Sequence, residues 1–338
     1  MGRTTIRDVA RTAGVSVGTA SNALAGKVSV APALRDRVTK AAEAVSYVPH
    51  PFAAGLRRGA TRSIGLCLPN LANPFFSELA QQINAALDRV GYDLVMVESG
   101  EDEAREAVKL RTLLSGRVDG IFIVPTADWT GPPLSDVPIV VLDRIRKDEP
   151  LPSAAVDNRA AAGLAYRHLY DAGHRDILMV VNGSQFWNAA LRVTGFLSEA
   201  ARCGARDRVR IFEVGMDPRE IALQVEAAFE GPRPTAIFSA NGLATLGTLR
   251  ALQDMGLKCP GDVSLVAIDD AVWMDVLRPA IDVVRQPVPE IARAGYDIMF
   301  HLLAEDATPD GPEAVILPPV LIRRDSVRHL PVPADASR

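Results

Sequence analysis

Apolar positions in residues 1–48 recur at helical spacing and include no run typical of a strand. The pattern predicts a first short helix that begins at Ile6. Thr5 and Asp8 have the spacing of a capping box at its start, and Gly14 ends it. The first 48 residues are therefore expected to form a small, all-helical unit.

Two further helices are predicted in the same segment. Ser16 is placed to cap the second helix, which extends to Leu24, and Pro32 suits the first turn of the third. Gly-Val-Ser joins the first two helices, and this arrangement over residues 5–26 is typical of a helix-turn-helix. Because the second helix of such a unit enters the major groove of DNA, the sequence predicts a DNA-binding headpiece.

From Ile64 onward, short apolar runs rich in β-branched residues alternate with helical stretches. The runs predicted to be strands are IGLCLP, DLVMVE, GIFIVP, PIVVLD, DILMVV, VRIFEV, AIFSAN and VSLVAID. Apolar strands separated by helices indicate parallel sheets covered on both faces. Residues 62–98 and 175–214 repeat the order strand, loop, helix, strand. We therefore expect two βαβ lobes, with ligand sites beyond the carboxyl ends of the strands.

The chain has 338 residues and a formal net charge of −4, which is unevenly distributed. Residues 1–62 hold ten Lys and Arg against three Asp and Glu, a net charge of +7. The other 27 Lys and Arg face 38 Asp and Glu, a net charge of −11. A basic head on an acidic body indicates that only the head meets a polyanion, although solvated surface charge is the plainer alternative.

Several other classes of protein lack support in the sequence. No apolar run approaches the roughly 18 residues of a membrane helix, and the start, MGRTTIRDVA, has no apolar signal core. We therefore expect a cytoplasmic protein without membrane contact. Three scattered cysteines favour neither a disulfide framework nor a zinc site. The motifs GxGxxG, GxxxxGK[ST], HExxH and CxxC do not occur, so we expect no enzyme, no cofactor and no metal.

The start of the second predicted helix carries the candidate DNA contacts. Val17 can touch a thymine methyl group, Asn22 can form two hydrogen bonds with adenine, and Gly18 offers only backbone. Small hydroxyl side chains suited to phosphate oxygens are Ser16, Thr19 and Ser21. A helical hairpin inside a core is the alternative. Residues 14–18 also match the G-x-S-x-G pattern of hydrolases, but that motif needs a preceding strand where a helix is predicted.

Motifs spread over nearly the whole chain resemble those of the LacI/GalR (lactose-repressor) family of bacterial transcription factors. In the headpiece they are TIRDVARTAGVS and the YVP of residues 47–49. In the body they are NPFF at 73–76, VDN at 157–159, AGHRDI at 172–177, RVTGF at 192–196, SAN at 239–241, IDD at 268–270 and VVRQP at 283–287. Coincidence is a poor explanation for so many motifs in the family order.

The resemblance implies an α/β protein in three parts. These are a helix-turn-helix headpiece at 1–48, a hinge at 49–60, and an effector-binding and dimerisation domain at 61–330. This domain resembles two-lobed periplasmic binding proteins with parallel sheets. Lobe 1 is expected over about 61–155 and 286–313, and lobe 2 over about 156–285 and 314–330.

The resemblance also implies contacts between the hinge and DNA. In the family the hinge folds on the minor groove of the operator, and a leucine, here at the position of Leu56, wedges into the central base step. Arg57 follows it and suits a phosphate. Thr5 and His50 are also expected to contact DNA. The family usually has Asn at the position of His50 and Arg or His at that of Asn22, so the hinge contacts and operator bases are expected to differ.

The candidate effector site combines aromatic and polar residues. Four large aromatic side chains fall at predicted strand-to-helix loops: Phe75, Phe76, Trp187 and Trp273. They suit a sugar or a small ring compound, with ordinary core packing as the alternative. The resemblance places Arg192, Asn241 and Asp269 at polar positions that hold the ligand in the family. Gly242 stands where the family commonly has Asp, which puts the role of that position in doubt.

These expectations combine into a ligand-responsive DNA-binding transcriptional regulator, a repressor switched by a sugar or sugar derivative bound between two lobes. Two headpieces that read a palindromic operator require a homodimer. The alternative is a sugar-binding protein without a gene-regulatory role, which would share the body but have no use for residues 1–60.

Overall fold

The computed structural model describes residues 4–24, 30–45, 47, 61–116, 118–126, 131, 136–146, 150–183, 185–304 and 314–331. The chain divides into two compact units, residues 1–62 and residues 63–338, and each is described by itself. The predicted hinge at 49–60 lies outside the described residues.

The smaller unit contains the three predicted helices, α1 (Ile6–Ala13), α2 (Val17–Leu24) and α3 (Pro32–Ala44). At the start of α1, the backbone N–H and the hydroxyl of Thr5 both donate to Oδ2 of Asp8, over 3.0 and 2.8 Å. Gly14 ends the helix with φ of +64°, a conformation in which glycine avoids the Cβ clash of other residues. Apolar side chains from all three helices form one core.

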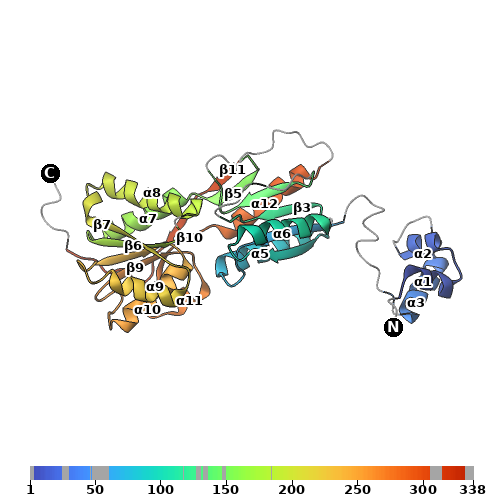
Figure 1. Ribbon diagram of the computed structural model, residues 1–338, viewed down its shortest axis with the longest axis horizontal. Helices are drawn as coiled ribbons and strands as arrows, with labels where there is room; N and C mark the ends of the chain where they lie inside the picture. Colours follow the sequence, from blue (N-terminus) through green and yellow to red (C-terminus); the bar gives the residue numbers. More distant parts are fainter. Residues whose placement is uncertain are drawn as a thin grey trace. The chain divides into compact units, whose positions relative to one another are not determined.

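The larger unit consists of two lobes, each built on a six-stranded sheet (Figure 1). The first sheet has the order β11-β5-β4-β3-β1-β2, and its paired strands are parallel. Its strands are β1 (Ser63–Leu68), β2 (Asp93–Glu98), β3 (Gly120–Ile123), β4 (Ile139–Leu142), β5 (Ser153–Val156) and β11 (Ala314–Leu317). Its helices are α5 (Pro74–Asp88), α6 (Glu103–Ser115) and α12 (Val288–Leu302).

The second sheet has the order β12-β10-β9-β8-β6-β7, with β12 antiparallel to β10. Its strands are β6 (Ile177–Asn182), β7 (Val209–Val214), β8 (Ala236–Ser239), β9 (Ser264–Ile268), β10 (Asp282–Arg285) and β12 (Val320–Ile322). Its helices are α7 (Asn158–Asp171), α8 (Trp187–Arg202), the short 3-10 helix η1 (Arg206–Arg208), α9 (Pro218–Ala227), α10 (Gly242–Asp254) and α11 (Val272–Val276).

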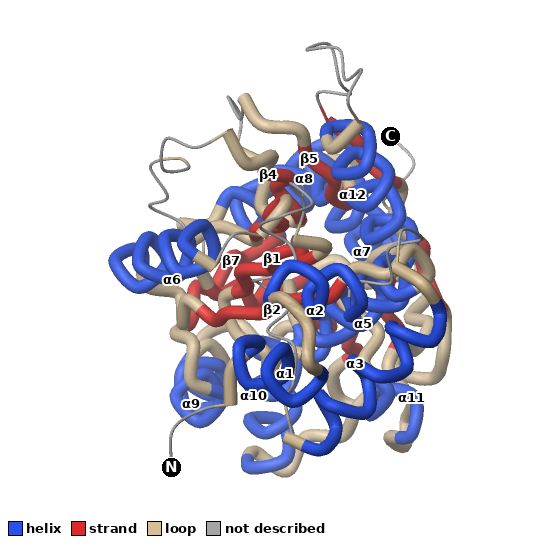
Figure 2. The backbone as a smooth tube through the Cα atoms, turned by 90° about the vertical axis from the view of Figure 1, so that its right-hand side faces the viewer, coloured by secondary structure: helices blue, strands red, loops and turns tan. Residues whose placement is uncertain are grey.

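Helices cover both faces of each sheet, as the apolar strands predicted. In the first lobe α5 and α12 pack on one face and α6 on the other. In the second lobe α7 and α8 pack on one face, and α9, α10 and α11 on the other. Figure 2 shows the strands of the larger unit at its centre with helices around them. All six residues of β1 are buried, which explains why this strand is a continuous apolar run instead of an alternating one.

In its described part, the chain passes between the lobes at three crossings: from β5 to α7, from β10 to α12, and from β11 to β12. One expected boundary is corrected here. We expected the second lobe to resume at residue 314, but residues 314–317 form β11, which pairs with β5 in the first sheet. Hydrogen bonding to that sheet edge keeps them in the first lobe, so the final crossing follows Leu317. No described helix is long and apolar enough to cross a membrane.

Candidate functional site

The first turn of α2 presents the predicted DNA-contacting side chains to solvent. Ser16, Val17 and Gly18 are exposed, whereas Ala20 and Ala23 on the opposite side are buried in the headpiece core. Val17 leaves 40% of its surface uncovered. An exposed apolar side chain at the start of the second helix is what contact with a thymine methyl requires.

Two of the predicted phosphate contacts also build the helix. The Ser16 hydroxyl accepts a hydrogen bond from the backbone N–H of Thr19 over 3.0 Å, and the two hydroxyls lie 2.8 Å apart. Ser16 is therefore the N-cap of α2, as the sequence predicted. Ser21 and Asn22 are half-buried, and Thr5 is exposed beside Asp8. The predicted contacts His50, Leu56 and Arg57 lie outside the described residues.

A cleft of about 1170 Å³ lies between the two lobes of the larger unit. Its walls come from residues 72–75, 77, 78, 81 and 82 at the start of α5, residues 242, 243 and 246 at the start of α10, residues 269–273 before and within α11, residues 285–290 at the second crossing, and Val320. The cleft thus lies beyond the carboxyl ends of β9 and β10, where parallel sheets generally bind ligands. Of the seven predicted effector contacts, Phe75, Asp269 and Trp273 line it.

Asp269 accepts hydrogen bonds from the second lobe and from the segment that crosses from β10 to α12. Its Oδ1 accepts a hydrogen bond of 2.6 Å from Nε2 of Gln286, and its Oδ2 accepts one of 3.3 Å from the backbone N–H of Gly242. The backbone of Asp269 has φ of +75°, a conformation that Asp adopts more readily than most residues. Sequence reasoning overlooked Gln286, although it follows the end of a buried strand within VVRQP.

Asn241 and Arg192 lie close to the cleft and bind protein groups. Asn241 is the N-cap of α10, since its side chain accepts from Ala244 N–H over 2.9 Å. Arg192 is 4% exposed; its Nε donates to Asn158 Oδ1 and its Nη1 to the Ala240 carbonyl, each over 2.7 Å. Both residues fix the second lobe at the carboxyl end of its sheet, and contact with a ligand stays a proposal for them.

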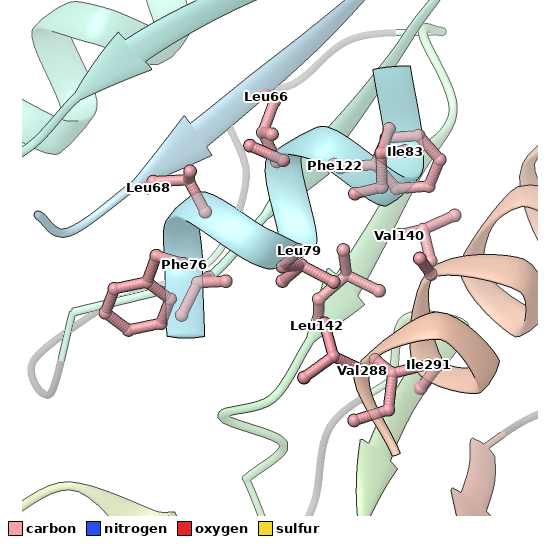
Figure 3. Close-up of a cluster of buried hydrophobic side chains, with 14 of the residues drawn as sticks. Leu66, Leu68, Phe76, Leu79, Ile83, Phe122, Val140, Leu142, Val288 and Ile291 are labelled. Atoms are coloured by element: carbon pink, nitrogen blue, oxygen red, sulfur yellow. The ribbon is translucent and has the colours of Figure 1, made fainter. Parts of the chain in front are cut away.

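Phe76 and Trp187 occupy other surroundings. Phe76 is 4% exposed and belongs to the apolar core of the first lobe drawn in Figure 3 (Figure 3). The half-buried Trp187 is the first residue of α8. Neither belongs to the cleft walls that the described residues form. Phe75 and Phe76 are consecutive, so their side chains leave the helix in directions about 100° apart, and only Phe75 reaches the cleft.

A buried ion pair, missed by sequence reasoning, lies at the carboxyl edge of the first sheet. The Arg144 guanidinium forms two hydrogen bonds with the Glu101 carboxylate, of 2.7 and 2.8 Å, and one of 3.2 Å with the Pro125 carbonyl. It also lies 4.0 Å from the ring centroid of Phe186, which precedes α8 in the second lobe. Beside it, Asn188 of α8 donates to Asp143 Oδ2 over 3.1 Å. These contacts join the lobes directly.

Burial shifts the pKa values of two carboxyl groups at this edge. Desolvation raises the pKa of Asp143, although the nearby charges of Arg192 and Arg144 oppose the rise. Desolvation also raises the pKa of Glu106 to about 7, against the lowering effect of hydrogen bonds from the backbone and hydroxyl of Thr126. Asp143 directly follows the buried run PIVVL, and a polar residue in that place is the signal that could have identified it.

The arrangement offers hydrogen bonds and aromatic contact to a small molecule. The described residues include no group of three or more His, Cys, Asp or Glu placed to hold a metal ion. The cleft has walls from both lobes and from the crossing segment at residues 285–290. A ligand in it contacts both lobes and therefore favours one arrangement of the lobes over others. This is the geometry of a ligand-controlled switch.

Comparison with known proteins finds relatives for both units of the chain. Residues 5–50 match the bacterial regulatory proteins of the lacI family, and residues 166–327 match a periplasmic binding protein-like domain. HTH-type transcriptional regulator PtxS of Pseudomonas putida is 32% identical over 90% of this chain and 91% of its own. Catabolite control protein A of Priestia megaterium is 30% identical over 89% of this chain and 93% of its own.

Solved structures share the fold. A lac repressor dimer bound to operator and the anti-inducer ONPF superposes with a TM-score of 0.81, at 24% identity, over 97% of this chain and 100% of that one. A complex of transcriptional regulator CelR with cellobiose gives a TM-score of 0.67, at 24% identity, over 96% of this chain and 100% of that one.

The headpiece with its exposed second helix and the two-lobed body with its cleft define a ligand-responsive, DNA-binding transcriptional regulator. The chain belongs to the LacI family of bacterial regulatory proteins, as its similarity to PtxS over nine-tenths of its length shows. The family expected from the sequence motifs is thereby confirmed.

Proposed function

We propose that the protein is a repressor that binds a palindromic operator as a homodimer and changes its DNA affinity when a sugar-like molecule occupies the cleft. The observation that carries the proposal is the Gln286–Asp269 hydrogen bond, which ties the second crossing to the cleft wall. A ligand that competes for this carboxylate also acts on the segment joining the lobes. The exposed face of α2 has no role in a sugar-binding protein without a regulatory function. Because the proposed target is chromosomal DNA, we place the protein in the cytoplasm.

Exposed apolar side chains support the proposed homodimer. Edge strand β2 exposes 38% of Val95 and 49% of Met96, and Val108 on the adjacent α6 is 52% exposed. An edge strand with exposed apolar side chains is a site for association. The lac repressor, which shares this fold, forms a dimer on its operator. A second copy of this chain is the partner that brings two headpieces onto two half-sites.

The ligand is sought by the thermal stability of the full-length protein with a panel of sugars and sugar derivatives. A ligand that binds only the folded state at about 100 times its Kd adds roughly 2.7 kcal/mol to the free energy of unfolding. The compound that stabilises the protein is then added to operator complexes. A change in operator affinity in either direction supports the proposal, whereas binding without such a change contradicts the switch.

Gly18→Glu tests the DNA-binding face. We expect operator affinity to fall about tenfold or more, about 1.4 kcal/mol, because the new carboxylate faces the phosphates. A Cβ at this position meets only the Ser16 hydroxyl, at 3.8 Å, so the helix itself is undisturbed. Fluorescence anisotropy measures the affinity, with an operator selected from genomic fragments by the wild type.

Gly18→Ala is the matched control and should keep the wild-type affinity. The wild-type affinity should also fall steeply and linearly on a plot of log affinity against log salt. Equal affinities for the Glu and Ala variants would show that α2 does not face DNA.

Asp269→Asn tests the ligand site. Asn keeps the size of the side chain and tolerates the positive φ, but it loses the charge that strengthens hydrogen bonds to ligand hydroxyls. We expect affinity for the identified ligand to fall about 30-fold, corresponding to about 2 kcal/mol for a charged hydrogen bond, with operator affinity unchanged. Isothermal titration calorimetry measures the first and anisotropy the second. Wild-type ligand affinity in the variant would place the ligand away from this carboxylate.

A further inference from the structure

One buried polar group beside Asp269 in the cleft wall is a hydrogen-bond acceptor without a partner among the described residues. Gln286 is 4% exposed, lines the cleft, and has no hydrogen-bond partner for its Oε1 among the described residues. The orientation of this amide is fixed, because the Asp269 carboxylate accepts hydrogen bonds and must therefore face the Nε2 donor. A buried acceptor without a partner indicates a ligand that donates.

Glu78 brings a second carboxylate to the opposite wall. It lies on α5 in the first lobe and lines the same cleft as Asp269 and Asp270 of the second. Desolvation raises the pKa of Glu78; the Arg285 charge lowers it, and the charges of Asp269 and Asp270 raise it further. The charges of Asp269 and Asp270 in the second lobe thus act against the ionised form of Glu78 in the first, and the charge of Arg285 acts in its favour.

The positive charge lining this part of the cleft is already engaged. Arg285 donates from Nε to Asp270 Oδ2 over 2.8 Å, and a second of its nitrogens binds the same oxygen. Arg324 donates to the other oxygen of Asp270 over 2.7 Å. Both arginines are paired with Asp270, and Arg324 also contacts Asp275, so the other carboxylates that line the cleft are Glu78, Asp269 and Glu290.

Resting on the function proposed above, we propose that the effector is a polyhydroxyl compound without an acidic group, bound through hydroxyl or ammonium donors to Asp269, Gln286 and Glu78. A carboxylate or phosphate on the ligand would add a further negative charge, and that group would bring no donor to the Gln286 acceptor. Glu78 therefore acts as a specificity residue that excludes sugar acids and sugar phosphates.

The test uses matched compounds with the full-length protein. The panel pairs neutral and amino sugars with their acidic derivatives: glucose and glucosamine with gluconate and glucose 6-phosphate, galactose with galacturonate, and ribose with ribose 5-phosphate. We expect a non-acidic member to raise the melting temperature and to bind at least ten times more tightly than its acidic partner. An acidic compound that binds as tightly as its neutral partner overturns the inference.

Glu78→Gln separates the role of Glu78 from that of the rest of the cleft. It should reduce the preference for the non-acidic compound to less than threefold, while Glu230→Gln, which removes a charge from an exposed position outside the cleft walls, leaves the preference intact. An unchanged preference in the Glu78 variant overturns the assignment. If no compound in the panel binds, the sugar class of the proposed function fails, and this inference fails with it.

A ligand-free measurement tests the environment of Glu78, in which burial and the carboxylates of Asp269 and Asp270 raise its pKa against the charge of Arg285. Because the folded-state pKa of Glu78 is raised, the folded protein binds a proton there more tightly than the unfolded chain does. The free energy of unfolding of the wild type, relative to Glu78→Gln, should therefore increase as pH falls from 7 to 5. Asp269, Asp270 and Arg285 face this group in both proteins, so the difference isolates Glu78. A difference that does not vary with pH contradicts this environment of Glu78.

Discussion

Arg144→Ala is expected to lower the free energy of unfolding of the larger unit by about 3 kcal/mol, toward the lower end for breaking a buried ion pair. The variant leaves the Glu101 carboxylate without its two hydrogen bonds in a site where 23% of its side chain is exposed. It also removes the cation that lies over the Phe186 ring of the other lobe, a contact of about 1 kcal/mol in partly buried sites.

Urea unfolding followed by circular dichroism measures this loss. Arg111→Ala, on an exposed position of α6, is the control and should remain within about 0.5 kcal/mol of the wild type. Arg144→Lys should lie between the two, because lysine keeps the charge but not the two-pronged geometry. An alanine variant as stable as the control would mean that the pair contributes nothing to the junction of the lobes.

Gly195→Ala is expected to destabilise the second lobe by about 3 kcal/mol or more, at or above the upper end of typical overpacking. An added Cβ would lie 2.2 Å from the carbonyl oxygen of Arg159 and 2.7 Å from its Cα, so the backbones of α7 and α8 must separate. The same separation would pull Arg192, one turn earlier on α8, from Asn158, which it now binds over 2.7 Å. Ligand affinity should therefore fall together with stability.

Gly163→Ala is a matched control in the same helix pair. Its Cβ would meet only Glu199 Cβ, at 3.9 Å, an ordinary contact. Because alanine favours a helix over glycine, this variant should be as stable as the wild type or more stable by about 0.5–1 kcal/mol. Thermal unfolding of both variants gives the comparison. Equal melting temperatures would show that the helices move apart at no cost.

Local patterns in the sequence predicted the parts of the fold that local physics determines. The start of α1 at Ile6 and the cap of α2 follow from short-range hydrogen bonds, and the long apolar strands follow from burial on both faces. Strands β5, β10, β11 and β12, of three or four residues each, were not predicted, although the equally short β3, β4 and β8 were. They form because neighbouring strands offer hydrogen bonds, which local sequence does not encode.

The sites divide in the same way. Motifs predicted Asp269, which lines the cleft, and Val17, which is exposed on the helix proposed to contact DNA. They did not identify the pair of Glu101 and Arg144, because 43 residues separate its members. Nor did the motifs show that Phe75 lines the cleft and Phe76 does not. Adjacent positions are equally good candidates for ligand contact until the packing of the helix on its sheet is known.

The three crossings have a consequence for the synthesis of the chain on a ribosome. The first lobe starts at β1, but its sheet is completed only when β11 has been made, after the whole run from α7 to β10 of the second lobe. Until α12 emerges, the face of the sheet that it covers is open, including Phe122 and Leu142, which approach Gly295 of α12 in the finished protein. The headpiece, by contrast, is complete early. During translation the protein thus has a DNA-binding unit long before it has a finished first lobe, and this exposed apolar face is the surface that a chaperone would meet.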